Sequence, residues 1–236
     1  MSDENLGLQV KEFIVYAVGN GISYDGLVKA MIKAMYPDLN VYAERRLVKK
    51  LQALIESIRN AEKPRTPYDM PIEEAKQIIM NRRGTAYLID NLGLPEIYEI
   101  LRYSRQLGRN INFARIIVFI NPWGNTAAFK MAFGENSMME IARKHETDLI
   151  RGTDKHVHHV FRDSMDIEEL ISNMNRELKE YVIHLIENDL EIQNNNILII
   201  ADHGYDIECE GTMCRLCHGG DCMKPTFSLI TPLVML

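Results

Sequence analysis

A set of carboxylate, imidazole and hydroxyl side chains in this 236-residue sequence has the composition of a metal centre with a nucleophile. Its members are Asp90, Asp154, Asp202, His158, His203, His218 and Thr126. Carboxylate oxygens and imidazole nitrogens together suit divalent cations such as Zn²⁺ or Mn²⁺. Two such ions ~4 Å apart can hold an attacking and a leaving oxygen, and one would deprotonate a hydroxyl that is otherwise a poor nucleophile. The inventory therefore predicts two divalent metal ions and a catalytic Thr126.

Taken singly, each of these residues has an ordinary structural explanation. An aspartate after a strand, such as Asp90, often caps a helix, and Thr126 has the same alternative. Asp154 and His158 have the i,i+4 spacing of a solvated pair on a helix. Asp202-His203-Gly204 is more specific, because two metal-type ligands directly after a buried strand are costly without a purpose. Only the complete set indicates chemistry.

The elements that must position these residues are strands and helices that alternate from residue 72 onward. Apolar runs predict strands at 86–89, 114–120, 196–201 and 227–236, with a further short strand at 149–150. Three- and four-residue spacing predicts helices at 95–106, 126–144 and 166–188. This alternation is typical of an α/β fold with a mostly parallel sheet sandwiched between helices. Ligands bind at the carboxyl ends of strands in such sheets, where Asp90, Thr126 and Asp202 are expected to meet.

Residues 1–65 form a predicted helical N-terminal segment, and residues 66–236 form the α/β domain. Periodic apolar residues predict helices at 10–18, 24–35 and 41–60. The third of these carries Arg45, Arg46, Lys49 and Lys50. The segment has three interpretations: a helix-turn-helix-like module, a dimerisation element, or helices with a solvated face that pack on the main domain. We favour packing on the main domain, and a homo-oligomer stays open.

Composition excludes several classes of protein. The apolar fraction of 46% and the charged fraction of 25% are those of a globular protein. The longest uncharged apolar runs fall far short of the ~20 residues of a membrane-spanning helix, so no membrane partner is expected. The net charge of −6 makes nucleic acid an open but unfavoured partner. The acidic start Met1-Ser-Asp-Glu differs from the basic and then apolar start of a signal peptide, which predicts a cytoplasmic protein.

The order of the chemical residues resembles that of the alkaline phosphatase superfamily. The order is Asp, Thr, Asp-x-x-x-His, Asp-His-Gly and His, and the resemblance covers about residues 84–236. Its most specific part is 166–204, a long predicted helix followed by Asn-Ile-Leu-Ile-Ile-Ala-Asp-His-Gly. The closing His-Gly-Gly and Ile-Thr-Pro-Leu-Val are similar to the last ligand histidine and the last core strand. Within the superfamily, the short core most resembles PglZ-type domains.

The resemblance implies a metal-dependent phosphoric ester hydrolase, a phosphatase or phosphodiesterase, that acts through a covalent phospho-threonine at Thr126. It implies one cation bound by Asp90, Asp202 and His203. It implies a second cation bound by Asp154, His158 and His218. The substrate would be a phosphorylated small molecule or a nucleotide. Two departures from the family are visible, because no arginine accompanies the nucleophile and the Cys-x-Pro-x-Arg signature of sulfatases is missing.

A different class of function is the alternative. The chain would then be a non-catalytic, phosphatase-like regulatory or nucleic-acid-binding protein with a structural zinc site.

All the cysteines lie in one Cys-rich loop, 209–222: Cys209, Cys214, Cys217 and Cys222. Their spacing predicts an additional structural zinc, bound by four thiolates or by three thiolates and His218. We favour four thiolates, which leave His218 for the catalytic centre. Two other interpretations are haem attachment at Cys-Arg-Leu-Cys-His, which needs export, and disulfides, which the cytosol disfavours outside hyperthermophiles. His156 and His159 flank the Asp-x-x-x-His motif, and either could replace His158.

Overall fold

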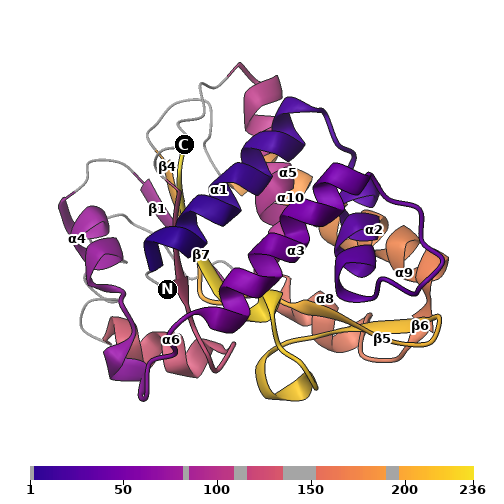
Figure 1. Ribbon diagram of the computed structural model, residues 1–236. Helices are drawn as coiled ribbons and strands as arrows, with labels where there is room; N and C mark the ends of the chain where they lie inside the picture. Colours follow the sequence, from indigo (N-terminus) through magenta and orange to yellow (C-terminus); the bar gives the residue numbers. More distant parts are fainter. Residues whose placement is uncertain (1–2, 82–84, 109–115, 135–152, 190–196) are drawn as a thin grey trace.

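The computed structural model describes residues 3–81, 85–108, 116–134, 153–189 and 197–236, and Figure 1 shows the arrangement of their elements. The N-terminal helices are α1 (Asp3–Gly19), α2 (Tyr24–Met35) and α3 (Arg45–Asn60). The helices that follow are α4 (Glu73–Asn81), α5 (Leu94–Gln106), α6 (Thr126–Phe133), α8 (Asp154–His159), α9 (Ile167–Met174) and α10 (Glu180–His184), the last two joined and extended by π-helical turns at 175–179 and 185–189. The strands are β1 (Thr85–Ile89), β2 (Ile116–Ile120), β3 (Met165–Asp166), β4 (Ile197–Ala201), β5 (Asp206–Glu210), β6 (Met213–Cys217) and β7 (Ile230–Met235). The strand predicted at 149–150 and most of the helix predicted beyond 133 lie outside the described residues.

The main sheet is mixed, so the predicted mostly parallel sheet is wrong. The strand order is β1-β4-β7-β2, and β1 with β4 is the one parallel pair among the described strands. The last strand, β7, pairs antiparallel with both of its neighbours, β4 and β2. An apolar run that is buried on both faces has the same appearance in either direction. The sequence pattern therefore located β7 without indicating that its direction is reversed.

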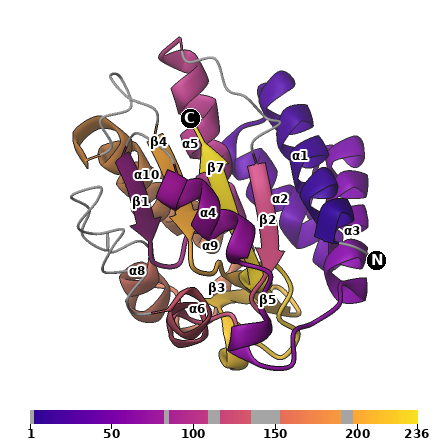
Figure 2. The same cartoon turned by 90° about the vertical axis from the view of Figure 1, so that its left-hand side faces the viewer.

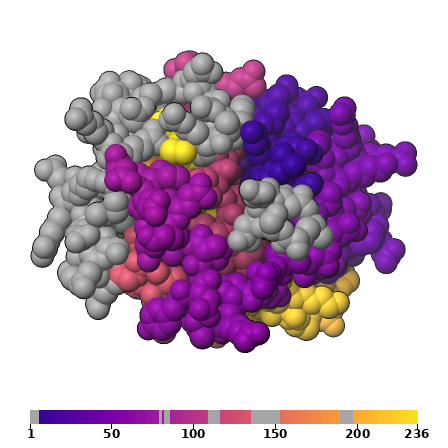
Figure 3. Space-filling model, turned by 60° about the vertical axis from the view of Figure 1, so that its left-hand side comes forward, coloured from indigo at the N-terminus to yellow at the C-terminus, as the bar shows by residue number. Residues whose placement is uncertain are grey.

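Both faces of this sheet are covered, and alternate strand residues supply two separate apolar clusters (Figure 2). One face, which includes Ile89, Val118 and Ile199, belongs to the large core that extends through α1, α2, α3, α5, α9 and α10. The other face, which includes Phe119 and Ile200, packs against Phe129 and Phe133 of α6 and against α4. Figure 3 shows α4 and the segment before it spread over α6 on this side. These layers exclude water from the strands whose ends carry the candidate site.

A second, small sheet of order β3-β6-β5 was not predicted, because β6 and part of β5 were assigned to the Cys-rich loop 209–222. β5 and β6 form an antiparallel hairpin with Cys209 opposite Cys214. Gly211 in the turn has a φ of +59°, a conformation that residues with a Cβ rarely adopt. The alternation Asp-Ile-Glu-Cys-Glu followed by a glycine turn is typical of a hairpin. The cysteine spacing, however, is also typical of a zinc-binding loop, which was the interpretation favoured from the sequence.

The N-terminal helices pack directly on the α/β layers. α1 lies against β2 and α5, and α2 lies against α5 and α9. The Tyr98 hydroxyl of α5 donates a hydrogen bond to the Ile22 carbonyl between α1 and α2. Packing of these helices on the main domain was the interpretation that the sequence favoured, and it is confirmed. The domain boundary near residue 65 stays a prediction. One apolar core includes residues from both sides of that position.

None of the helices in the described ranges combines the length and apolar character that crossing a bilayer requires.

A fully buried carboxyl group, Glu96 of α5, joins the N-terminal helices to the segment that follows β4. Tyr24 of α2 and Tyr205 both donate hydroxyl hydrogen bonds to Glu96 Oε1, the latter at 2.9 Å. The other oxygen, Oε2, is buried without a hydrogen-bond partner. Burial raises the pKa of Glu96 to about 7, although the two tyrosine hydrogen bonds oppose the rise.

This pKa predicts how stability depends on pH. In the unfolded chain Glu96 titrates near 4.5, and in the folded protein near 7. The free energy of unfolding should therefore fall as pH rises from about 4.5 to about 7, by about 3 kcal/mol. Glu96→Gln should remove this part of the slope. Urea unfolding at pH 5, 6, 7 and 8 measures the difference, with the exposed Glu74→Gln as control, and equal slopes for Glu96→Gln and wild type would contradict the assignment.

Candidate metal centre

The predicted site residues converge at one edge of the main sheet. Because β7 runs opposite to β4 and β2, the strands β1, β4 and β2 all run in the same direction. Figure 2 shows β1 and β2 pointing to the same end of the molecule, where α6 and α8 lie. Asp90 follows β1, Asp202 and His203 follow β4, and the loop after β2 leads to Thr126. The edge that ligands use in a parallel sheet is thus present in a mixed one.

Asp90, Asp202 and His203 form the first group whose ligand atoms could hold a metal ion, all within 4.8 Å of one another. Asp202 is fully buried, and its Oδ1 accepts hydrogen bonds from the backbone N–H groups of Asn91 at 3.0 Å and His203 at 2.8 Å. Its Oδ2 is buried with no hydrogen-bond partner and lies 3.8 Å from His203 Nε2. A buried carboxylate oxygen without a donor is costly, and a cation would satisfy it. This orphaned oxygen fits a metal site.

The ring of His203 is oriented for ligation. His203 Nδ1 lies 3.0 Å from the Gly204 carbonyl oxygen, which can only accept a hydrogen bond. The proton of the neutral ring therefore belongs on Nδ1, and the Nε2 lone pair faces Asp90 Oδ1 at 3.7 Å. A histidine that ligates a metal usually donates its other ring N–H in this way.

Asp154, His158 and His218 form the second group that meets the same distance criterion. Asp154 Oδ1 lies 3.3 Å from His158 Nε2 and 3.5 Å from His218 Nε2, and the two Nε2 atoms are 2.9 Å apart. Metal–ligand bonds of about 2.0–2.2 Å place ligand atoms at separations close to these. The side chains of this group are 33%, 47% and 13% exposed, whereas Asp202 and His203 are almost fully buried. The second group is therefore the one that faces solvent.

His218 presents its Nε2 to the second group. Burial and the neighbouring ring of His203 lower the pKa of His218. Its Nδ1 lies 3.1 Å from the Gly124 carbonyl oxygen, which places the ring proton on Nδ1 as in His203. The centroids of the His203 and His218 rings are 4.7 Å apart, so the two groups adjoin.

Two glycines set the position of His218 relative to the loop that leads from β2 to Thr126. Gly124 and Gly219 have φ values of +53° and +52°. A Cβ on Gly219 would lie 2.4 Å from the Trp123 carbonyl oxygen, and one on Gly124 would lie 2.8 Å from the Gly219 Cα. The backbone of the loop after β2 therefore touches that of the loop after β6, and neither position accepts a side chain.

Thr126 is the first residue of α6, and its hydroxyl is not used for capping. Asn125 is the cap residue, and its Oδ1 accepts a hydrogen bond from the Ala128 N–H at 2.9 Å. The Thr126 hydroxyl instead donates to Asp90 Oδ1 at 3.1 Å and lies 3.5 Å from His203 Nε2. The capping alternative for Thr126 is thus excluded by Asn125, and the hydroxyl lies beside the first group.

Crowding of carboxylates affects the charge of Asp90. Burial, followed by the negative charges of Asp202 and Asp154, raises the pKa of Asp90 to about 6. A bound cation would relieve both the repulsion and the desolvation. The electrostatics, like the geometry, fit a centre that holds divalent ions.

Two asparagines that the sequence analysis gave no role hold the site together. Asn91 has a φ of +52°, and its side-chain amide approaches Asp154 Oδ1 at 3.5 Å while its N–H binds Asp202. Asn121 is buried, and its amide donates to the carbonyl oxygens of Asp202 at 3.1 Å and Asn125 at 3.0 Å. Their places directly after strands were the only available signal. Asparagine tolerates the left-handed conformation better than other residues with a Cβ, which accounts for its use at position 91.

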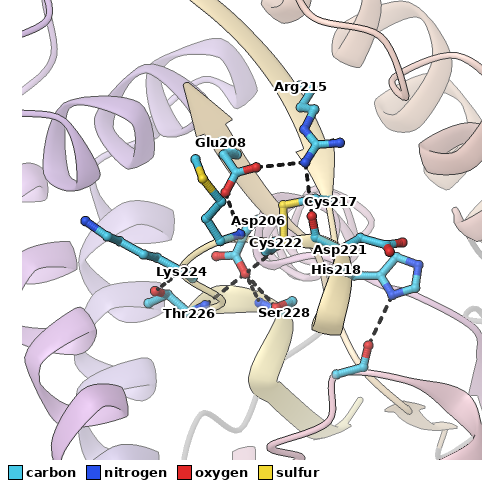
Figure 4. The surroundings of a disulfide bond; sticks show 12 residues. Asp206, Glu208, Arg215, Cys217, His218, Asp221, Cys222, Lys224, Thr226 and Ser228 are labelled. Atoms are coloured by element: carbon cyan, nitrogen blue, oxygen red, sulfur yellow. Dashed lines mark hydrogen bonds and ion pairs between the residues drawn. A yellow bond between two sulfur atoms is a disulfide. The ribbon is translucent and has the colours of Figure 1, made fainter. Parts of the chain in front are cut away.

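The cysteines are paired as two disulfides, Cys209–Cys214 and Cys217–Cys222, so the structure differs from the predicted four-thiolate zinc site. The spacing led to zinc because close cysteines on a hairpin and its following loop serve either purpose. Cys209 and Cys214 face each other directly across β5 and β6. Cys217 and Cys222 close the loop that carries His218 (Figure 4). His218 is consequently free of the cysteines.

Asp206, at the start of β5, anchors the chain that follows this disulfide. Its carboxylate accepts hydrogen bonds from the backbone N–H groups of Thr226, Phe227 and Ser228 at 2.7–3.1 Å and from the Ser228 hydroxyl at 2.5 Å (Figure 4). Arg215 of β6 donates to the Asp221 carbonyl at 3.0 Å within the disulfide loop. The loop that presents His218 is thus held at both ends.

The other histidines that the structure describes are not members of the two groups. His156 lies 3.6 Å from Glu177 Oε2 and packs on Tyr181, and His159 is exposed on α8. His184 is exposed on α10, and His145 lies outside the described residues.

Comparisons with known proteins do not identify this chain: no protein-family model, no curated protein and no solved structure matches it. The resemblance to the alkaline phosphatase superfamily therefore stays a prediction from the motifs.

The two groups predict that each chain binds two divalent cations. Asp202→Asn should lower the affinity of the first group for its ion, and His218→Gln should lower that of the second group. Each loss should exceed about a hundredfold, because replacing a residue that only hydrogen-bonds to a ligand already lowers metal affinity by about 10–100-fold. Metal content per chain after loading with Zn²⁺ and gel filtration measures this, with the exposed His184→Gln as control. A wild-type protein that binds one ion or none, or a His218→Gln variant that retains two, would contradict the scheme.

The disulfide at the His218 loop predicts a difference between the two cysteine pairs. Replacing Cys217 and Cys222 by serine should weaken the second ion about tenfold, because the loop that presents His218 loses its covalent closure. The matched control replaces Cys209 and Cys214, which cross-link the hairpin further from His218, and should leave that affinity near wild type. Competition with a zinc chelator gives both affinities. Equal losses in the two double variants would mean that the hairpin as a whole, and not the loop closure, positions His218.

Proposed function

We propose that this protein is a metal-dependent phosphoric ester hydrolase, a phosphatase or phosphodiesterase, with Thr126 as its nucleophile. The observation that supports this most is the place of the Thr126 hydroxyl, 3.1 Å from Asp90 Oδ1 and 3.5 Å from His203 Nε2. A threonine that served only to start a helix would have no reason to face two candidate ligands. The proposed substrate is a phosphorylated small molecule or a nucleotide.

The residues of this chain have distinct parts in the proposed reaction. Asp90 Oδ1 accepts the hydrogen bond of Thr126 and so orients the hydroxyl oxygen toward a phosphorus atom. The first N–H groups of α6 have no acceptor within the helix, and together with the helix dipole they favour phosphoryl oxygens beside Thr126. Divalent cations at the two ligand groups would supply positive charge to the phosphoryl oxygens and lower the pKa of the hydroxyl.

The proposed bond changes are those of a displacement followed by hydrolysis. The Thr126 oxygen forms a bond to phosphorus as the bond from phosphorus to the ester oxygen breaks. The hydroxyl proton passes to Asp90 or to solvent, and the ester oxygen takes up a proton and leaves as the alcohol. Water then attacks the phosphorus of the phospho-threonine and gives a proton back to the threonine oxygen, which releases phosphate, or a phosphomonoester from a diester, and restores the hydroxyl. Divalent cations at the two ligand groups would be the main source of positive charge for the phosphoryl group.

The alternative from the sequence, a non-catalytic regulatory or nucleic-acid-binding protein with structural zinc, has less support. Its zinc site requires thiolates, and the cysteines are paired as disulfides. A cytoplasmic location stays a proposal, and the two disulfides count against it, because disulfides are rare in cytosolic proteins.

Hydrolysis of p-nitrophenyl phosphate and of its bis-ester, with added Mn²⁺ or Zn²⁺, tests the proposal. Thr126→Ala should lower kcat by roughly a thousandfold or more, the scale of losing a nucleophile. Thr126→Ser, which keeps a hydroxyl, should retain part of the activity. Thr212→Ala in the exposed β5–β6 turn is the matched control and should be unchanged. Metal-dependent turnover that survives in Thr126→Ala would refute the nucleophile, and no turnover of either ester under any metal would count against the enzyme.

A further inference from the structure

A cavity of about 430 Å³ opens beside the second ligand group. His158 and His218, which belong to that group, are also part of its wall. Arg162, Arg215 and Asp221 contribute the charged part of the lining. The volume is within the range of small-molecule sites, about 300–1,000 Å³. A molecule whose phosphoryl group lies at the candidate metal centre has room here for the rest of its structure.

The charged lining of this cavity is mainly basic, although the whole chain has a net charge of −6. Arg215 is held in place by Glu208 Oε2 at 2.9 Å and by the Asp221 carbonyl at 3.0 Å, and both contacts use its Nη2. The remaining N–H groups of that guanidinium are left to other acceptors. Figure 4 shows Arg215 and His218 on either side of the disulfide loop.

Arg162 is different from Arg215, because it has no hydrogen bond or ion pair with any residue in the part of the chain that the structure describes. It follows α8 by a few residues, so it comes from the same segment as Asp154 and His158. Its guanidinium is a free, planar donor next to a candidate phosphoryl site. Guanidinium groups bind carboxylates and phosphates through two parallel hydrogen bonds, which ammonium groups cannot do.

We propose that this cavity binds a second negatively charged group of the substrate, with Arg162 as its principal partner. The substrate is then a phosphate ester whose alcohol carries a carboxylate or a further phosphate a few bonds from the ester oxygen. This inference rests on the proposed function, because it places the reacting phosphoryl group at the metal centre.

The test uses phosphonates, whose P–C bond is not hydrolysed, so that binding is measured independently of turnover. Propylphosphonate and 3-phosphonopropanoate differ in that a carboxylate replaces the terminal methyl group. Calorimetric titration of the Zn²⁺-loaded protein should show the carboxylate compound binding about tenfold more tightly, as expected for one charge-assisted contact. The longer pair, butylphosphonate and 4-phosphonobutanoate, reports the span between the two groups.

Arg162→Gln should abolish the preference for the carboxylate compound, and Arg162→Lys should retain only part of it. Arg45→Gln, an exposed arginine at the start of α3, makes the same change of charge away from the cavity and should keep the wild-type preference. A wild-type protein with no preference in either pair overturns the inference, as does a preference that survives in Arg162→Gln. Phosphatase activity without a preference for the carboxylate compounds overturns only the anion site and leaves the proposed function standing. A preference that depends on Arg162 without any phosphoester hydrolysis supports the anion site and overturns the proposed function.

Discussion

Repulsion among the carboxylates of Asp90, Asp202 and Asp154 is the constraint on which the rest of the site depends. Asp202 is fully buried, and burial of Asp90 together with the negative charges of Asp202 and Asp154 raises the pKa of Asp90 to about 6. Backbone N–H groups satisfy one oxygen of Asp202, and the other has no partner. His203 and His218 direct their Nε2 atoms toward Asp90 and Asp154. A cation bound among these groups would relieve the repulsion among the carboxylates.

Much of the candidate site could be predicted from the sequence because it depends on strand ends. Asp90, Asp202 and His203 directly follow apolar runs, and strands that run in one direction bring such residues to one edge whatever lies between them. The ligand roles themselves are still predictions. The direction of β7 was not predictable, since Ile230–Met235 is buried along most of its length and has no alternation that would distinguish a parallel from an antiparallel partner.

Contacts between segments distant in sequence account for what was missed. Asn91 reaches Asp154 and Asp202 only in the folded chain, and Gly124 meets Gly219 across two loops. The β5–β6 hairpin had a local signal in its alternating residues and Gly211, but the cysteine spacing fitted zinc as well as it fitted disulfides. Thiol chemistry depends on which side chains face each other, and that information lies in the strand register rather than in the spacing.

The docking of the N-terminal helices has a consequence for any shortened version of this protein. β2 is an edge strand, and α1 covers the face that contains Val118. Removing residues 3–60 would expose the edge strand β2 and its apolar face to solvent. Glu96 would also lose the hydrogen bond from the Tyr24 hydroxyl. A fragment that begins at the predicted boundary near residue 65 would contain every candidate ligand and yet be prone to pair with other chains through β2. The helices are therefore best regarded as part of the folding unit that holds the site, and not as a removable appendage.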